Sequence, residues 1–397
     1  MIDSETSQMN VDFTNTEIAF SSKSDKKLKN QARLFRFMNN PTLVKLGSPF
    51  ALLGARLNIP LTNSIIKKTI FTHFCGGETL IECQPKIDHL SKFKTFTILD
   101  FGAEGKTTED ELDWTLQEFL RAVKFAGSNA SVPVVSVKLT ALADNDLLEK
   151  WQTGDSFSEE ESLRWEKVQY RVNTLCETAF HNNVKVFIDA EESWIQGTIA
   201  HLAEEMMKKY NKEQAVVYTT YQLYRHDHLA QLQMDYEKSL REKYVFATKL
   251  VRGAYMGKER ARAKEMGYPS PIQPDKPATD KDYNTAVEFC VDHYQTLGLC
   301  NATHNLESSM LQAELIAEKN LPKSHPHLSF SQLYGMSDNI TFNLANAGYN
   351  VAKYLPYGPV REVVPYLIRR AKENSSVTGD MSRELKLIVE ELERRGL

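Results

Sequence analysis

The sequence has few cysteines and no pair of them in a spacing that binds metal or cycles between redox states. Its 397 residues include five cysteines, an odd number, and no CxxC motif. Disulfide frameworks and structural zinc sites need such pairs, so we expect free thiols and a reducing compartment. No metal site is predicted.

Long apolar runs and an excess of basic charge are also missing. No apolar stretch reaches the roughly 20 residues that cross a bilayer. A net charge of -4 lacks the basic field that nucleic-acid binding requires, so no nucleic-acid partner is predicted. The first 22 residues contain no Lys or Arg, which is atypical of secretory signals and mitochondrial presequences. We therefore expect a cytoplasmic protein, or a mitochondrial one from which a presequence has been removed.

From about residue 95 onward, short β-rich runs alternate with amphipathic helical segments. The predicted strands are Thr95–Asp100, Val134–Leu139, Lys185–Asp189, Val216–Tyr221, Ala247–Val251, Leu299–His304, Leu328–Leu333 and Val351–Leu355. Eight strands separated by helices indicate an α/β fold of the (β/α)8 TIM-like barrel type. A doubly wound sheet is the alternative, but it would normally carry a Gly-rich first turn, which this chain lacks.

Four segments are expected along the chain. Residues 1–27 are polar and predicted to be a disordered tail, and residues 28–90 a helical arm. Residues 91–378 form the barrel, with its last helix over the barrel mouth, and residues 379–397 a terminal helix. Four prolines predict an extended loop over Gly267–Asp280, after the fifth strand.

Polar residues stand where the predicted strands end, which is where barrel enzymes gather their active sites. They are Asp100, Glu104, Lys138, Asp189, Glu191, Glu192, Gln222, Lys249, Arg252, His304 and Tyr354. So many polar groups at one mouth predict an active site. Strand alternation would place Asp189 and Glu191 on one face, but no second histidine is suitably spaced to complete a metal site.

Lys138 stands between apolar neighbours on the second strand and has three interpretations. A buried lysine can be a Schiff-base nucleophile, because desolvation lowers its pKa. It can also be a permanent cation that holds an anionic substrate. The third interpretation is a rim lysine with its ammonium group in water.

The helix predicted to follow Tyr354-Leu-Pro-Tyr-Gly-Pro has an apolar and a polar face. The apolar face consists of Val360, Val363, Val364, Leu367 and Ala371. The polar stripe consists of Tyr366, Arg369, Arg370 and Glu373. Two adjacent guanidinium groups suit a carboxylate or a phosphate, which they bind through paired hydrogen bonds. Alternatively, the stripe is a solvated face on which Glu373 neutralises Arg369.

Six motifs in order resemble the proline dehydrogenase family over about residues 95–377. They are Val137-Lys-Leu-Thr-Ala-Leu142, Phe187-Ile-Asp-Ala-Glu-Glu192, Thr220-Tyr-Gln222, Lys249-Leu-Val-Arg-Gly-Ala-Tyr255, Ala302-Thr-His-Asn305 and Tyr366-Leu-Ile-Arg-Arg370. The fourth motif and the Pro-rich insertion after it resemble the branch found in mitochondria and some bacteria. Many bacterial members carry Arg first and Lys second in that motif, which leaves open whether Lys249 or Arg252 approaches the flavin N5.

The resemblance implies FAD-dependent oxidation of L-proline to Δ1-pyrroline-5-carboxylate, with electrons passed to a membrane quinone. Peripheral contact with an inner membrane would suit that acceptor, and the oligomeric state is not predicted. The residues implied to line the flavin are Ala190, Gln222, Lys249, Arg252, Gly253, Ala254, Thr303 and His304. Those implied to bind substrate are Lys138, Tyr354, Tyr366, Arg369, Arg370 and Glu373.

The same resemblance implies more specific roles for a few residues. Asp189, Lys249, Lys138 and Tyr354 are the catalytic set, in which Asp189 orders the network and keeps Lys138 charged. Tyr354 would select proline over hydroxyproline, and Glu104 would pair with Arg369 as a gate. Two other activities stay open: a Schiff-base lyase or aldolase using Lys138, and another flavin barrel such as a reductase of folate-bound one-carbon units.

Overall fold

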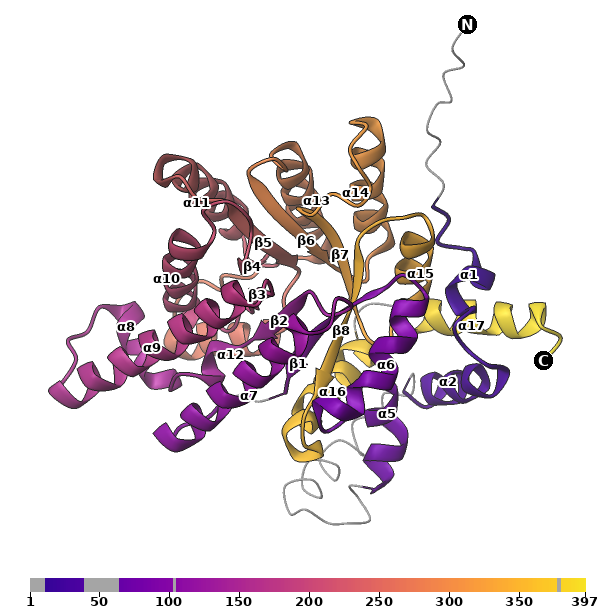
Figure 1. Ribbon diagram of the computed structural model, residues 1–397, viewed down its shortest axis with the longest axis horizontal. Helices are drawn as coiled ribbons and strands as arrows, with labels where there is room; N and C mark the ends of the chain where they lie inside the picture. The colour runs from indigo at the N-terminus through magenta and orange to yellow at the C-terminus, as the bar shows by residue number, and fades with distance from the viewer. Residues whose placement is uncertain (1–10, 39–63, 103–104, 377–379) are drawn as a thin grey trace, which may run out of the picture. The chain divides into compact units, whose positions relative to one another are not determined.

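The computed structural model describes residues 11–38, 64–102, 105–376 and 380–397, without the side chains of residues 370–382. Eight parallel strands form a closed barrel in chain order, as the sequence predicts (Figure 1). They are β1 (Phe96–Phe101), β2 (Val134–Val137), β3 (Lys185–Ile188), β4 (Val217–Gln222), β5 (Phe246–Val251), β6 (Leu297–Ala302), β7 (Leu328–Leu333) and β8 (Val351–Tyr357). Each observed strand lies within about two residues of its predicted bounds.

The chain divides into two compact units, of which the first spans residues 103–330. Its helices are α7 (Glu109–Gly127), η2 (Leu139–Ala141), α8 (Asn145–Thr153), α9 (Glu159–His181), α10 (Ser193–Tyr210), α11 (His228–Glu242), α12 (Met256–Met266), α13 (Lys276–Asp292) and α14 (Leu306–Glu318). Capping boxes begin α7 and α9, where Thr108 pairs with Glu111 and Ser158 with Glu161. Local sequence therefore sets where these helices start.

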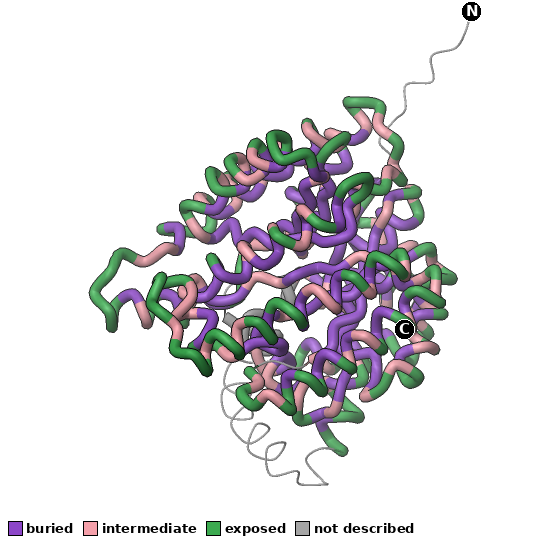
Figure 2. The backbone as a smooth tube through the Cα atoms, turned by 60° about the vertical axis from the view of Figure 1, so that its left-hand side comes forward, coloured by how far each residue is buried: buried purple, intermediate pink, exposed green. Residues whose placement is uncertain are grey.

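Strands β2 to β6 of this unit pair in parallel register, so their carboxyl ends share one rim. Strand β4 is buried at every position, and Figure 2 shows buried strands inside helices whose outer turns are exposed. The strands are rich in β-branched and aromatic residues, as in the VYTTYQ of β4, which is why their positions were predictable.

The second unit combines residues 10–102 with residues 331–397. Its helices are α1 (Thr16–Phe20), α2 (Asp25–Met38), η1 (Lys67–Phe71), α5 (Thr72–Phe74), α6 (Leu80–Lys92), α15 (Asp338–Asn346), α16 (Val360–Ser376) and α17 (Asp380–Arg394). Strands β1 and β8 pair within it. Its apolar core joins the predicted face of α16 (Val360, Val363, Val364 and Leu367) to Phe20, Phe35, Phe71 and Ile388.

A group of four charged residues, three of them buried, joins N-terminal and C-terminal segments of the chain inside this unit. The Asp338 carboxylate lies 2.6 Å from Lys23 Nζ and 2.9 Å from Lys353 Nζ. The Ser337 N–H donates to Glu384 Oε2 at 3.0 Å. Burial would raise the pKa of Asp338, but the two ammonium groups hold it well below its ordinary value. Burial raises the pKa of Glu384 to about 7.

The structure differs from the expected disordered tail in residues 11–27. Asn15 caps α1, and Phe20 and Ala19 are fully buried. Asn339 and Asn343 of α15 donate to the carbonyl groups of Phe13 and Asn15. The polar composition of this segment predicted disorder, but its few apolar residues pack against other parts of the chain.

The predicted extended loop over Gly267–Asp280 is also shorter than expected. Helix α13 already begins at Lys276, because Asp275 accepts a hydrogen bond from the N–H of Ala278 and Pro277 suits a first helical turn. Of the expected helical arm, residues 39–63 lie outside the described residues. Within the part that the structure describes, no helix combines the length and apolar content needed to cross a membrane.

Candidate active site

Polar side chains meet at the carboxyl rim of the first unit, and Asp189 is their centre. Directly after β3, Asp189 Oδ1 accepts hydrogen bonds from Lys249 Nζ and, at 2.6 Å, from Ser136 Oγ. Lys138 Nζ lies 4.0 Å from Asp189 Oδ2. The side chains of Lys138 and Lys249 are only 12% and 6% exposed. Two ammonium groups of low exposure, one from β5 and one from the end of β2, thus share one carboxylate.

The electrostatics of this group favour the ionised form of Asp189. Burial by itself would raise the pKa of the Asp189 carboxyl, but the ammonium groups of Lys249 and Lys138 hold that pKa below its ordinary value. The low exposure of Lys138 disagrees with a rim lysine whose ammonium group stands in water. The Lys138 ammonium group forms an ion pair with Asp189, an arrangement that suits an anchor for anions.

Glu191 lies in the same loop but binds a different partner. Its carboxylate accepts the Thr140 N–H at 3.1 Å and the Thr140 hydroxyl at 2.5 Å. The Gln222 side-chain amide donates to the Glu191 carbonyl oxygen at 2.7 Å. Strand alternation does not apply to Asp189 and Glu191, because β3 ends at Ile188. Burial raises the pKa of Glu191 to about 7, although the Thr140 hydrogen bonds oppose this rise.

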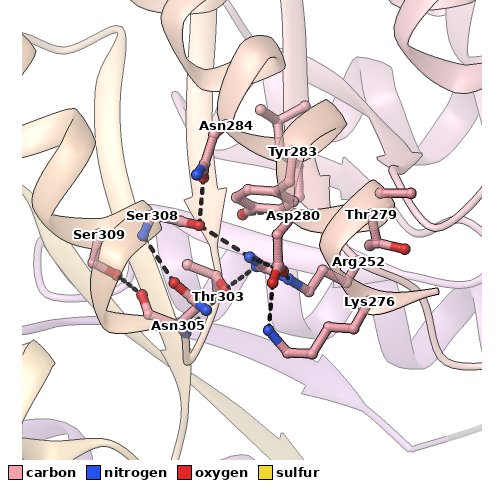
Figure 3. A network of polar contacts seen from close by, with 12 residues as sticks. Arg252, Lys276, Thr279, Asp280, Tyr283, Asn284, Thr303, Asn305, Ser308 and Ser309 are labelled. Atoms are coloured by element: carbon pink, nitrogen blue, oxygen red, sulfur yellow. Dashed lines mark hydrogen bonds and ion pairs between the residues drawn. The ribbon is translucent and has the colours of Figure 1, made fainter.

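Arg252, in the loop after β5, is held by a second polar network (Figure 3). Its Nε donates to Asp280 Oδ1 at 2.8 Å, its Nη1 to Thr303 Oγ1 at 2.8 Å and its Nη2 to Ser308 Oγ at 3.0 Å. The guanidinium carbon lies 4.3 Å from the centre of the Tyr283 ring. Helices α13 and α14 therefore fix the orientation of this guanidinium group.

The end of β5 also exposes two small residues next to this network. Gly253 and Ala254 are exposed, and Gly253 has a φ of 137°. A Cβ atom on Gly253 would come within 2.4 Å of the Tyr224 ring, so only glycine fits there. Backbone is thus open to a ligand beside a set of donor groups. Ala190 and His304 are half-buried at the ends of β3 and β6.

The remaining predicted site residues belong to the second unit. Tyr354 on β8 and Tyr366 on α16 are buried, and Arg369 on α16 is half-buried. The side chains of Arg370 and Glu373, and the whole of Glu104, lie outside the described residues. The structure therefore brings together Lys138, Asp189 and Lys249 in the first unit. Gln222 is joined to Glu191, and Arg252 and Thr303 belong to a second network.

The sequence did not predict several supporting residues, among them Thr140, Asp280 and Tyr283. Thr140 lies 51 residues from Glu191, and Asp280 lies 28 residues from Arg252. The only local signal was that Asp280 and Tyr283 lie three residues apart and share a helix face. That signal is too common to identify a site.

Comparison with known proteins places these motifs in context. A family model described as proline dehydrogenase matches residues 83–383. The mitochondrial proline dehydrogenase 1 of Drosophila melanogaster is 39% identical over 235 residues, covering 57% of this chain and 34% of that protein. The hydroxyproline dehydrogenase of Xenopus laevis is 31% identical over 413 residues, covering 95% and 88%. The matched part of the chain covers between about a third and two thirds of the length of several curated relatives.

Solved structures show the same fold. A crystal structure of proline utilization A from Bdellovibrio bacteriovorus, inactivated by N-propargylglycine, matches with a TM-score of 0.70. The match covers 90% of this chain and 38% of that one, at 22% sequence identity. Likeness at this identity supports the barrel architecture and no more.

Proposed function

Because the chain belongs to the proline dehydrogenase family, we propose that it oxidises L-proline to Δ1-pyrroline-5-carboxylate, with FAD as the hydride acceptor. The reaction removes a hydride from the carbon beside the ring nitrogen and a proton from that nitrogen. The observation that carries the proposal is the ionic group of Lys138, Asp189 and Lys249, whose side chains are at most 13% exposed. Fixed positive charge in a water-poor site binds the carboxylate of a small amino acid strongly.

The residues around this group fit a flavin. Lys249, Arg252 and Thr303 provide donors, and donors near the N1–C2 edge of a flavin stabilise its reduced anion. Gly253 and Ala254 leave backbone exposed beside them. We propose that these residues, with Ala190, Gln222 and His304, hold the cofactor.

We propose that charged residues bind the carboxylate of the substrate and that aromatic residues pack against its ring. In this proposal Lys138, Arg369 and Arg370 bind the proline carboxylate, and Tyr354 and Tyr366 pack against its ring. Holding the ring in one orientation lowers the entropic cost of reaching the transition state. Asp189 keeps the Lys138 ammonium charged and oriented.

The later electron acceptor follows from the family resemblance alone. We propose a membrane quinone, reached by peripheral contact of the protein with the membrane. Reduction of a soluble short-chain quinone by proline, in the presence of the purified protein, tests the first half of this proposal. Flotation of the protein with liposomes tests the second half.

The decisive experiment is the colour of the purified protein. Bound oxidised FAD should make it yellow, and anaerobic L-proline should bleach it. A yellow protein that proline leaves unbleached would favour a different flavin substrate. A colourless protein that borohydride joins covalently to a carbonyl substrate would instead support the lyase alternative, in which Lys138 is the nucleophile.

Lys138 variants separate the two roles of this lysine. If Lys138 binds the carboxylate by charge, Lys138→Arg should retain part of the activity and Lys138→Met should raise the KM for proline by about tenfold or more. FAD content should stay near the wild-type value in both. Loss of all activity in Lys138→Arg, together with a trapped adduct in the wild type, would contradict the anchoring role.

A further inference from the structure

Lys138 is followed by a tight turn whose backbone is held from both sides by one loop. Two residues before Lys138, the Ser136 hydroxyl donates to Asp189 Oδ1 at 2.6 Å. Two residues after it, the Thr140 N–H and hydroxyl donate to Glu191. The loop after β3 therefore holds the chain on either side of Lys138 through two different carboxylates.

The Glu191 carboxylate is itself fixed in place. Glu191 is only 2% exposed, and its N–H donates to Gln196 Oε1 at 2.8 Å. Its carbonyl oxygen accepts the Gln222 amide at 2.7 Å. Glu191 thus joins the ends of β2, β3 and β4 to helix α10, and its side chain has little freedom to turn elsewhere.

Both oxygens of the Glu191 carboxylate are engaged by Thr140, which argues against direct binding of substrate. Burying a carboxylate costs free energy that hydrogen bonds from a single threonine only partly offset. The next residue, Glu192, reaches instead to Lys258, whose side chain is 66% exposed. The two adjacent glutamates therefore have different partners: Glu191 binds Thr140, and Glu192 binds Lys258.

We propose that Glu191 is a positioning residue, which fixes the turn after Lys138 and thereby aims the Lys138 ammonium group at the carboxylate of the substrate. The inference rests on the proposed function, in which Lys138 binds that carboxylate. Displacement of such a group by about 1 Å is enough to cost much of its binding contribution. Loss of Glu191 therefore weakens substrate binding more than it slows the chemical step.

The test uses Glu191→Ala and Glu191→Gln, with Glu192→Gln as the matched control. In the FAD-loaded protein, Glu191→Ala should raise the KM for proline by about tenfold while kcat changes less than about threefold. Glu191→Gln keeps an acceptor for the Thr140 N–H and the side-chain volume, so its KM should lie between that of Glu191→Ala and the wild type. Glu192→Gln should match the wild type.

Thr140 gives a second route to the same contact. Thr140→Val removes the hydroxyl donor and should raise KM, whereas Thr140→Ser should retain the wild-type value. In the double variant, Thr140→Val should raise KM little beyond the effect of Glu191→Ala, because both changes disrupt the same contact between Thr140 and Glu191.

Hydrogen exchange reports on the turn without any activity measurement. Amides of residues 139–142 should exchange at least about tenfold faster in Glu191→Ala than in Glu192→Gln, with or without FAD. Unchanged exchange in Glu191→Ala overturns the inference. So does a fall in kcat at unchanged KM. If Lys138→Met leaves the KM for proline unchanged, the proposed role of Lys138 fails, and exchange still decides whether Glu191 fixes the turn.

Discussion

Tyr354 is the residue at which substrate choice should be decided. Its ring is buried on β8, and we propose that it packs against the ring of the substrate. In the proposed site the phenol ring fills the space that a 4-hydroxyl group on the substrate would need. The chain is also 31% identical to a hydroxyproline dehydrogenase, so the two substrates form a meaningful comparison.

We predict that the wild type prefers proline over trans-4-hydroxyproline and that Tyr354→Ser narrows the preference. The ratio of the two kcat/KM values should fall by about tenfold, mainly because proline loses packing against the ring. Tyr354→Phe keeps the ring and should keep the preference. Equal kcat/KM values for both substrates in the wild type would contradict this role.

Individual residues also show what the sequence could and could not predict. Lys138, Asp189 and Lys249 were identified because strand ends of a parallel barrel meet at one rim, whatever the details of packing. Thr140 and Asp280 were not, because their partners are brought near only by the folded chain. Spacing predicts where a side chain stands, whereas its hydrogen-bond partner depends on tertiary structure.

At the scale of the element, helix α13 supports the site through Asp280, which holds Arg252 by a charge-assisted hydrogen bond. We predict that Asp280→Asn weakens FAD binding by about tenfold, since Arg252 loses its counterion and its fixed orientation. Titration of FAD into cofactor-free protein measures the Kd. The matched control is Asp282→Asn on the same helix, where Asp282 accepts a hydrogen bond from Gln273.

If Asp280→Asn and the wild type bind FAD with equal affinity, the Arg252 network stabilises the fold and does not contribute to FAD binding. In that case the thermal midpoint should fall while the Kd stays constant. The KM for proline should be little affected in either case, because Arg252 is proposed to hold cofactor rather than substrate.

The bounds of some helices and strands could be predicted from the sequence more accurately than those of others. The strands were predicted within about two residues because each is a short β-rich run between two amphipathic helical segments. The start of α13 was missed because its prolines suggested a loop, although Pro277 stands in a first turn capped by Asp275. The same proline therefore signals either a helix start or a loop, and the cap decides between them.

At the scale of the whole molecule, the buried charges of the second unit make stability depend on pH. The pKa of Glu384 is raised by burial to about 7, above its ordinary value of about 4.3. Between these values the folded chain binds a proton that the unfolded chain releases. Because the unfolded chain is stabilised by ionising Glu384 while the folded chain keeps it protonated, the free energy of unfolding falls as pH rises through this window.

We predict that Glu384→Gln gains stability relative to the wild type as pH rises. The difference in thermal midpoint, variant minus wild type, should grow by a few degrees between pH 5 and pH 8. Glu191, which titrates in the same range, is present in both proteins and cancels in the difference. Differences that stay constant with pH would show that Glu384 titrates normally.

The packing of the second unit determines when its core can form during translation. Helix α2 ends at Met38, but the partners of its buried face, such as Ile388, come from the last part of the sequence. At about 5–20 residues per second, roughly 15–60 s of translation separate α2 from residue 331, where the unit resumes. Through that interval Leu28, Ala32 and Phe35 have no completed core to enter. Until then these apolar side chains should stay accessible to chaperones at the ribosome. A product truncated before α17 should expose the same side chains to proteases.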